Sequence, residues 1–235
     1  MIKACLNGGR SQSDHAAVPL TPEKLAADAA ACADAGAGAV HVHPRDADGA
    51  ETLAPAAVDP AVAAIRGVVP GLPVGVTTGA WIAPSVADRL AAIRSWTVLP
   101  DFASVNVHEA GALEAAGALA ERGIGVEAGV WTVAAAAAYA EWTVPCLRIL
   151  VECMQRSAPA ALANAHAVLD ALPAGGPPVL LHAQDASAWD VLREAVRLGL
   201  HTRIGLEDTL VLPDGSVAPD NAALVAAAVT LTHGG

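Results

Sequence analysis

Short apolar segments alternate with alanine-rich segments along nearly the whole chain, and this alternation limits the folds that the sequence can adopt. The short segments are rich in Val, Ile and Leu and have the length of strands, whereas the alanine-rich segments have helical periodicity. The pair repeats at intervals of about 25 to 30 residues, which is typical of βα units. We expect strands at residues 2–6, 39–43, 73–77, 102–107, 123–127, 146–151, 178–182 and 202–206.

Capping residues mark the starts of several predicted helices. Thr21 and Asp59 each stand directly before a proline, where a side-chain oxygen can accept a hydrogen bond from the first helical turn. Ser187 and Asp220 are placed to cap two later helices. Each predicted helix is also long enough to cross back over a parallel sheet.

The number of βα units favours a closed (β/α)8 TIM barrel of the α/β class. A chain of 235 residues has the usual length for such a barrel on a single core, so we expect one domain over residues 1–235. The alternative is an open, doubly wound sheet. The first predicted strand is followed by Asn7-Gly8-Gly9-Arg10 and not by a GxGxxG or GxxxxGK[ST] motif, which argues against that alternative.

Composition excludes several classes of partner. The formal net charge is −11, so neither nucleic acid nor an anionic membrane surface is expected as a partner. Charged residues interrupt every long apolar run, and the first residues lack the apolar stretch of a signal peptide, so we expect neither a membrane span nor export. The cysteines have no CxxC spacing and indicate reduced thiols in a cytoplasmic protein; they are Cys5, Cys32, Cys146 and Cys153.

Polar side chains gather at the predicted C-terminal ends of the strands, where barrels of this class build their active sites. The opposite strand ends are mostly apolar, so the distribution predicts a polar cavity at one end of the barrel. The residues concerned are Asn7, His41, His43, Thr77, Thr78, Ser104, Asn106, His108, Glu127, Glu152, His182, Gln184, Glu207 and Asp208.

His41 and His43 are the most specific of these residues. Side chains two apart on a strand point to the same face, so both imidazoles project to one side. Together they suit a transition metal, and Glu207 on the last strand can supply a carboxylate as the third ligand. The alternative is that both histidines are hydrogen-bonded residues of the core.

The pair Glu207-Asp208 allows two interpretations. In one, Glu207 is the metal ligand and Asp208 is a base carried by the following loop, held by Arg203. In the other, the two carboxylates cap a helix or form a salt bridge. Arg10 and Arg45 are candidates for binding a substrate carboxylate, because a guanidinium grips this group in bidentate fashion. A surface ion pair is the alternative for each.

Weaker features follow the third and fifth strands. Thr77-Thr78-Gly79 can direct hydroxyls and backbone N–H groups toward a ligand, or it can simply form a turn. Trp81 and Trp131 can line the cavity, although packing is the default explanation for both. His108, Glu152 and His182 lack a partner at a fixed spacing, so hydrogen-bonding roles are the simpler interpretation.

Several sequence blocks together resemble the β-keto acid cleavage enzymes, a family that includes 3-keto-5-aminohexanoate cleavage enzyme. The resemblance extends over nearly the whole chain, and its HxHxRDxDG and RxGLED blocks are specific in combination. The blocks are Val18–Ala26, Ala35–Gly49, Thr77–Gly79, Ala103–Asn106 and Thr202–Asp208.

The resemblance implies a TIM barrel that binds one Zn²⁺ through His41, His43 and Glu207. It implies conversion of a β-keto acid and acetyl-CoA into acetoacetate and a new acyl-CoA, with Asp208 as base. Family barrels often associate, so a homo-oligomer is expected. By similarity, Arg203 and Thr77 complete the catalytic set. The implied substrate contacts, together with the candidates above, are Asn7, Arg10, Arg45, Thr78, Gly79, Ser104, Asn106 and Glu127.

Three loops depart from the family pattern. Arg10 stands near the place of a glutamate that recognises a substrate amine, so an anionic or neutral substrate tail is expected. The glycine-rich loop after strand 6 is replaced by residues 151–156, and the loop after strand 7 by residues 182–185; in the family both help to hold CoA. Two alternatives therefore stay open: a metal-dependent hydrolase or lyase that does not use CoA, and a non-catalytic barrel that binds a metal or ligand.

Overall fold

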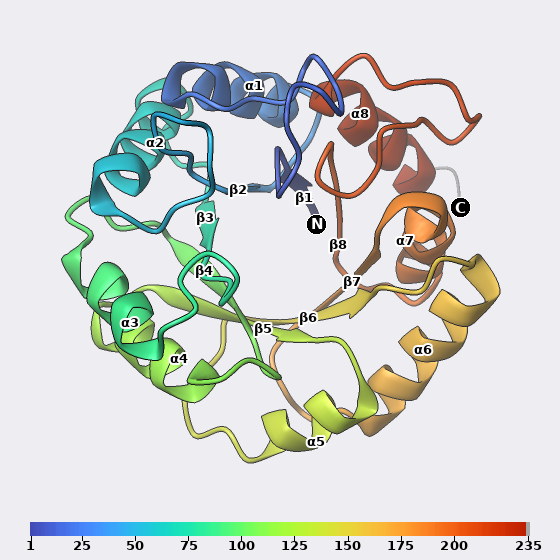
Figure 1. Cartoon of the computed structure of the whole chain (residues 1–235). Coiled ribbons are helices and arrows are strands. Elements are labelled where there is room, and N and C mark those ends of the chain that lie inside the picture. The colour runs from blue at the N-terminus through green and yellow to red at the C-terminus, as the bar shows by residue number, and fades with distance from the viewer. Residues whose placement is uncertain (234–235) are drawn as a thin grey trace.

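Strands and helices alternate through the computed structural model, which describes residues 1–233 (Figure 1). The predicted domain, residues 1–235, thus ends two residues beyond the described range. Nearly all strand residues are buried, which explains why their sequences are almost continuously apolar. The strands are β1 (Ile2–Cys5), β2 (Ala39–Val42), β3 (Val74–Thr77), β4 (Phe102–Asn106), β5 (Gly125–Val130), β6 (Arg148–Cys153), β7 (Val179–Ala183) and β8 (Thr202–Ile204).

The strands are parallel and form one sheet in the order β7-β6-β5-β4-β3-β2-β1-β8. A parallel bridge between Leu180 of β7 and His201, directly before β8, joins the two edges of this sheet. The N–H of His201 donates to the carbonyl of Val179 at 3.1 Å, and the N–H of Leu181 donates to the carbonyl of His201 at 2.9 Å. The sheet therefore forms a nearly closed barrel, which confirms the predicted TIM barrel and excludes the open sheet (Figure 1).

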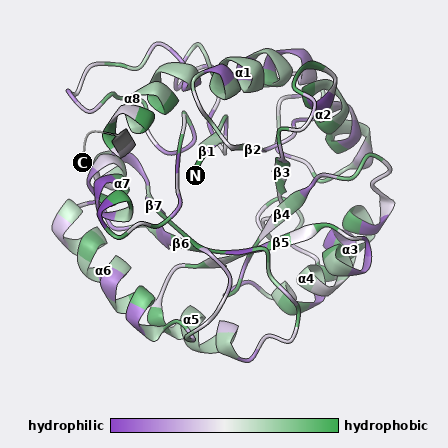
Figure 2. Cartoon of the chain, turned by 180° about the vertical axis from the view of Figure 1, so that it is seen from behind, coloured by the Kyte–Doolittle hydropathy of each residue, from purple (hydrophilic) through white to green (hydrophobic). Residues whose placement is uncertain are grey.

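The helices form a ring around the strands, and hydrophobic and hydrophilic residues both occur along them (Figure 2). This is the pattern of helices with one face on the sheet and one in solvent. They are α1 (Pro22–Asp34), α2 (Pro55–Val68), α3 (Val86–Ser95), α4 (Ala112–Glu121), α5 (Val133–Ala140), α6 (Ala158–Ala171), α7 (Ala188–Arg197) and α8 (Asn221–His233), with a short 3-10 turn, η1 (Asp185–Ser187), before α7. Within the described range, no helix has the length and apolar character needed to cross a bilayer.

Two of the predicted caps form as expected. Thr21 Oγ1 accepts from the backbone N–H of Lys24, and Asp220 Oδ1 accepts from that of Ala223. Ser187 stands at the N-cap position of α7 but donates its hydroxyl to the carbonyl of Gln155. The helix start predicted at Asp59 is wrong, because α2 already begins at Pro55.

Strands β5 and β6 lie further along the chain than predicted. The prediction ended the fifth strand at Glu127, whereas β5 continues through Gly129 to Val130. It ended the sixth strand at residue 151, whereas β6 runs from Arg148 to Cys153. A glycine within a strand gives the same local pattern as a turn, so Gly129 accounts for the early end predicted for β5. In β6 the apolar run stops at Val151, because Glu152 is charged.

Candidate active site

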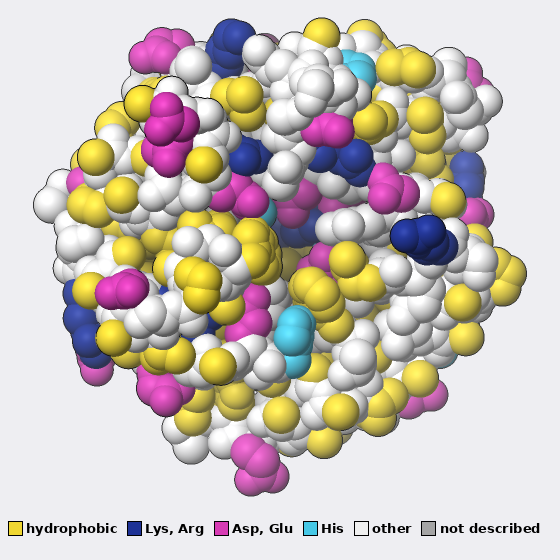
Figure 3. Space-filling model, in the orientation of Figure 1, with side chains coloured by type: hydrophobic (Ala, Val, Ile, Leu, Met, Phe, Trp, Pro, Cys, Tyr) yellow, Lys and Arg dark blue, Asp and Glu magenta, His cyan; other side chains and the backbone are white. Residues whose placement is uncertain are grey.

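A cavity of about 440 Å³ opens at the C-terminal ends of the strands, in the central hollow of Figure 3. This is the end of a TIM barrel that carries active sites. Acidic, basic and aromatic side chains all contribute to the walls. The lining residues are Gly9, Arg10, His41, His43, Thr77, Trp81, Ser104, Asn106, Trp131, Leu150, Glu152, Met154, Gln184, Asp185, Arg203 and Glu207.

His41, His43 and Glu207 converge at the base of this cavity. They offer ligand atoms that all lie within 4.8 Å of one another. His41 belongs to β2, His43 directly follows that strand, and Glu207 lies in the turn after β8. The Nε2 atom of His43 is 3.7 Å from Oε2 of Glu207. Two imidazoles and one carboxylate form a donor set that Zn²⁺ adopts in catalytic sites.

The chemical state of these side chains fits a divalent cation. Within residues 1–233, His41 Nδ1 and Glu207 Oε2 are buried and lack a hydrogen-bond partner. Burial lowers the pKa of His41 well below its usual value, which keeps the imidazole neutral, as a metal ligand must be. Burial alone would raise the pKa of Glu207, but Arg203 and His43 hold it below the usual value, so this carboxylate is ionised.

The loop after β1 supports two of the three candidate ligands. Gly8 has a positive φ of 51° and lies against Glu207, so that a Cβ at this position would overlap the Glu207 side chain. Asn7 fixes the backbone of His43 from both sides: its Oδ1 accepts from the His43 N–H at 2.8 Å, and its Nδ2 donates to the His43 carbonyl at 2.9 Å. The Asn-Gly pair thus holds the metal-site loops together.

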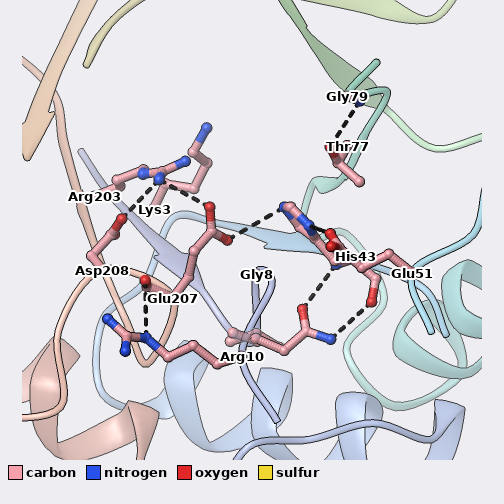
Figure 4. Close-up of polar contacts among 12 residues, drawn as sticks. Lys3, Gly8, Arg10, His43, Glu51, Thr77, Gly79, Arg203, Glu207 and Asp208 are labelled. Carbon is pink, nitrogen blue, oxygen red and sulfur yellow. Dashed lines mark hydrogen bonds and ion pairs between the residues drawn. The ribbon is translucent and has the colours of Figure 1, made fainter. Parts of the chain in front are cut away.

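Glu51 is a residue of this site that the sequence interpretation missed. Its Oε1 lies 2.5 Å from Nδ1 of His43 (Figure 4). Its Oε2 accepts a hydrogen bond of 3.2 Å from Nε1 of Trp81. Glu51 follows a turn after β2, where strand or helix periodicity gives no information. Only the HxHxRDxDG block, which ends two residues earlier, pointed to this part of the chain.

Asp208 lies beside Glu207, and Arg203 holds both carboxylates. The Nη2 atom of Arg203 is 2.7 Å from Asp208 Oδ1 and 2.9 Å from Glu207 Oε1 (Figure 4). Burial, together with the charges of Glu207 and Glu152, raises the pKa of Asp208 to about 7 against the opposing effect of Arg203. A carboxyl group with a pKa near neutrality suits general acid–base chemistry.

His182 and Glu152 extend this group of ionisable side chains across β7 and β6. The Nδ1 atom of His182 is 3.7 Å from Asp208 Oδ1, and its Nε2 is 3.6 Å from Glu152 Oε2. Gln184 donates to Glu152 Oε1 at 3.3 Å. Burial lowers the pKa of His182 and raises that of Glu152. Both were predicted at strand ends, but only the folded barrel shows that His182 lies between Asp208 and Glu152.

Thr77, Ser104 and Asn106 line the cavity on the side of β3 and β4. Thr77 Oγ1 accepts from the N–H of Gly79 at 3.1 Å, and Asn106 Nδ2 donates to Glu109 Oε1 at 3.0 Å. Their predicted position around the cavity thus agrees with the structure, while Gly79 lies behind Trp81, whose ring occupies the space that a Cβ at this position would need.

Three of the predicted substrate contacts form hydrogen bonds with backbone groups in the structure. Asn7 is fully buried and bonds to backbone groups, as described above. Thr78 donates its hydroxyl to the carbonyl of Ser104 at 2.6 Å. Arg45 donates to the carbonyls of Gly8 and Arg10, the latter at 3.0 Å. These side chains are used to hold loops in place, because the backbone groups beside the cavity need hydrogen-bond partners.

Glu127 is also not at the predicted place. It lies in the interior of β5, completely buried, and its two oxygens contact Lys3 and Arg148. The Arg148 contact measures 2.8 Å. The shift of β5 by three residues explains this correction, since the strand end moves from Glu127 to Val130.

Arg10 lies at the mouth of the cavity, as expected of a substrate contact. Its Nε donates to the carbonyl of Glu207 at 3.3 Å, and its Nη2 is 2.5 Å from Asp185 Oδ1. The Asp185 side chain is 71% exposed. Arg10, in the loop after β1, therefore joins the loop after β7 through an exposed ion pair and the turn after β8 through a hydrogen bond.

Comparison with solved structures shows a similar fold in proteins of low sequence identity. A binary complex of ObcA with oxaloacetate has a TM-score of 0.76 and 16% identity, covering 92% of this chain and 64% of that chain. A ternary complex of ObcA with a C4-CoA adduct and oxalate has the same TM-score, 17% identity and the same coverage. 3-Dehydroquinate dehydratase from Geobacillus kaustophilus HTA426 has a TM-score of 0.65 at 12% identity, covering 97% of this chain and 90% of that chain.

The chain therefore spans somewhat less than two thirds of the length of the ObcA chains that it matches. These structures show the fold, whereas a match to a family model shows the family. The model for the beta-keto acid cleavage enzyme matches residues 1–234, nearly the whole sequence. The chain thus belongs to the beta-keto acid cleavage enzyme family.

Proposed function

We propose that this protein is a zinc-dependent enzyme that condenses a β-keto acid with acetyl-CoA and releases acetoacetate and a new acyl-CoA. The observation that carries this proposal is the convergence of His41, His43 and Glu207 beside Asp208 at the base of one cavity. Membership of the family supports the reaction class. A bound Zn²⁺ would supply Lewis-acid polarisation of the carboxylate and ketone oxygens of the keto acid.

Asp208 is the proposed base that removes a proton from C2 of the keto acid. Its Oδ1 is held by Arg203, which orients the carboxylate, while Oδ2 lacks a hydrogen-bond partner among the described residues and is free to accept the proton. The pKa of about 7 favours transfer of the proton in both directions near neutral pH. Arg203 is accordingly proposed as a positioning residue.

The remaining wall of the cavity is proposed to hold the substrate. Thr77, Ser104 and Asn106 present polar groups on the side opposite β8. Arg10 at the mouth is the proposed contact for an anionic group at the end of the substrate remote from C2. Its present partner Asp185 is exposed and can be replaced at small cost, since exposed ion pairs contribute at most about 1 kcal/mol.

Metal analysis of protein purified without chelator tests the first part of the proposal. We expect about one Zn²⁺ per chain, because three protein ligands with an open position are sufficient for a catalytic site. The substitutions His41→Ala, His43→Ala and Glu207→Ala should each remove the metal. Retention of zinc in all three variants would refute the proposed site.

A panel of β-keto acids, assayed with and without acetyl-CoA, tests the second part. Formation of acetoacetate only in the presence of acetyl-CoA supports the cleavage reaction. The replaced loops at residues 151–156 and 182–185 favour one alternative, a hydrolase or lyase that does not use CoA. Turnover without acetyl-CoA would establish that alternative, and ligand binding without turnover would indicate a non-catalytic barrel.

We also propose a cytoplasmic location and assembly into a homo-oligomer. The location is supported by four free cysteines, three of which are buried. The assembly is supported by apolar side chains exposed on the helices, such as Val68 and Leu113. Light scattering on the purified protein tests the oligomeric state directly.

A further inference from the structure

The two histidines of the proposed metal site have different surroundings. His41 is 1% exposed, and among residues 1–233 its Nδ1 lacks a hydrogen-bond partner. His43 has a neighbour for each ring nitrogen: Nδ1 lies 2.5 Å from Glu51 Oε1, and Nε2 lies 3.7 Å from Glu207 Oε2. The orientation of the His43 ring is therefore set from outside the proposed ligand set, whereas that of His41 is not.

Glu51 also reaches the mouth of the cavity. Its second oxygen, Oε2, accepts a hydrogen bond of 3.2 Å from the indole Nε1 of Trp81. The Trp81 ring lies nearly parallel to the His43 ring, with 6.3 Å between ring centres and an interplanar angle of 26°. Trp81 lines the cavity and is 53% exposed. One carboxylate thus bridges a buried imidazole and an exposed indole.

The segment that carries Glu51 is well fixed. Glu51 forms an antiparallel bridge with Arg45, and the turn between them is closed by a hydrogen bond from the N–H of Asp46 to the carbonyl of Ala50. The carboxylate of Asp46 accepts from the N–H groups of Asp48 and Ala50. Because these contacts fix the backbone of Glu51, its carboxylate can constrain the ring of His43.

We propose that Glu51 is a positioning residue that directs Nε2 of His43 toward the metal and couples the orientation of Trp81 to metal binding. A carboxylate that accepts the second N–H of a ligating imidazole fixes its tautomer and raises its basicity. Metal binding at Nε2 of His43 should strengthen the contact between Nδ1 and Glu51. Because the Trp81 indole donates to the same carboxylate, this change alters the environment of Trp81. This inference rests on the metal site proposed above.

Zinc affinity in matched variants of the full chain tests the positioning role. We expect Glu51→Ala to weaken zinc binding by about 10- to 100-fold in competition with a chromophoric chelator. Glu51→Gln keeps an acceptor oxygen but no charge, so a smaller loss is expected. Asp48→Ala removes an exposed carboxylate from the same turn without a contact to His43 and should bind zinc as the wild type does.

Urea unfolding in the presence of EDTA distinguishes positioning from a general loss of structure. If Glu51 acts on the metal site, the unfolding midpoints of Glu51→Ala and Asp48→Ala in EDTA should agree with each other. A Glu51→Ala variant that binds zinc with wild-type affinity would overturn the inference while leaving the metal site intact. A wild-type protein that binds no zinc would overturn both the inference and the proposed function.

Tryptophan fluorescence tests the coupling to the cavity mouth. Zinc addition should change the emission of the wild type, and Trp81→Phe should remove most of this change, because Trp81 donates to the carboxylate that contacts His43. Glu51→Ala should also lose the change at zinc concentrations that saturate it. An unaltered zinc-dependent emission change in Trp81→Phe would refute the coupling.

Discussion

Two clusters of buried charges cross the interior of the barrel and differ in how completely their atoms are paired. The first, which we call the Lys3 cluster, consists of Lys3, Glu127 and Arg148. Lys3 on β1 contacts Glu127 on β5, and these strands are not neighbours in the sheet, so the contact spans the barrel. Arg148 lies beside Glu127 in the strand register and bonds to its other oxygen.

The second cluster, which we call the Asp208 cluster, consists of Arg203, Glu207, Asp208 and His182. Arg203, Asp208 and His182 are buried like the Lys3 cluster and Glu207 is partly buried, yet several atoms of these side chains lack a hydrogen-bond partner within the described part of the chain. These atoms are Glu207 Oε2, Asp208 Oδ2, Arg203 Nε and both ring nitrogens of His182, whereas in the Lys3 cluster Arg148 Nε is the one such atom among the described residues. Unpaired buried polar atoms are costly, so the barrel retains them where a ligand can bind. The Lys3 cluster therefore supports the barrel, and the Asp208 cluster is available for chemistry.

The same amide substitution in the two clusters should separate these roles. Asp208→Asn removes the proposed base but keeps an oxygen for Arg203. We expect turnover of a β-keto acid substrate to fall by about 100- to 10,000-fold, which is the usual contribution of a general base. Bound zinc should remain, because Asp208 is outside the ligand set. An unchanged rate in steady-state assays would exclude Asp208 as the base.

The corresponding substitution in the Lys3 cluster, Glu127→Gln, should act on stability. It leaves Lys3 and Arg148 buried without a countercharge, and breaking a buried pair in this way costs about 3 to 5 kcal/mol. Urea unfolding in EDTA measures the loss without a contribution from metal binding. Glu114→Gln, an exposed carboxylate on α4, should change the free energy of unfolding by less than about 0.5 kcal/mol. If both variants unfold alike, the Lys3 cluster does not support the barrel.

This contrast also shows what sequence could and could not predict. Strands and helices follow from local periodicity, and the period of two along β2 was enough to place His41 and His43 on one face. The Lys3 cluster joins residues 124 positions apart, and local patterns carry no information on such pairs. Glu51 was missed for a related reason: its turn lacks periodicity, and its role depends on a contact with His43.

The predicted end of β5 shows how an error in a strand boundary affects the role assigned to a residue. Placing the strand end at Glu127 made this residue a substrate contact, whereas continuation to Val130 places it inside the barrel. The period of a strand is two, so the predicted face was correct while the depth along the barrel was wrong. Depth is set by pairing with β4 and β6, which the sequence does not show.

Asp28 on α1 differs from the carboxylates of both clusters, because its hydrogen-bond donor is a neutral side chain, that of Asn221. Burial, with a contribution from Asp220, raises its pKa to about 7, opposed by the hydrogen bond from Asn221. Between about pH 4 and 7 the folded state retains a proton that the unfolded state has lost. Stability should therefore decrease as the pH rises through this window, by at most about 1.4 kcal/mol per pH unit.

Asp28→Asn should remove this pH dependence, because the amide oxygen still accepts from Asn221 but does not titrate. The measurement is the free energy of unfolding of both proteins at several values between about pH 4 and 7. As the pH rises, the free energy of unfolding of Asp28→Asn should increase relative to that of the wild type. Parallel curves would show that Asp28 ionises normally and that its burial does not resemble that of Asp208.

The smallest effect is expected at Asp185, where the Asp208 cluster meets solvent. The N–H of Asp185 donates to the carbonyl of Asp208 at 2.6 Å, and its exposed carboxylate pairs with Arg10. Its φ of 51° is in the left-handed region, which asparagine also tolerates, so Asp185→Asn keeps the backbone and removes only the charge. Arg10 then becomes available to a substrate carboxylate. The KM for β-keto acids with a second carboxylate should fall about two- to fivefold, in line with an exposed pair of at most about 1 kcal/mol. The KM for keto acids with a neutral tail should stay constant, and an equal change for both kinds of substrate would show that Arg10 does not select the tail.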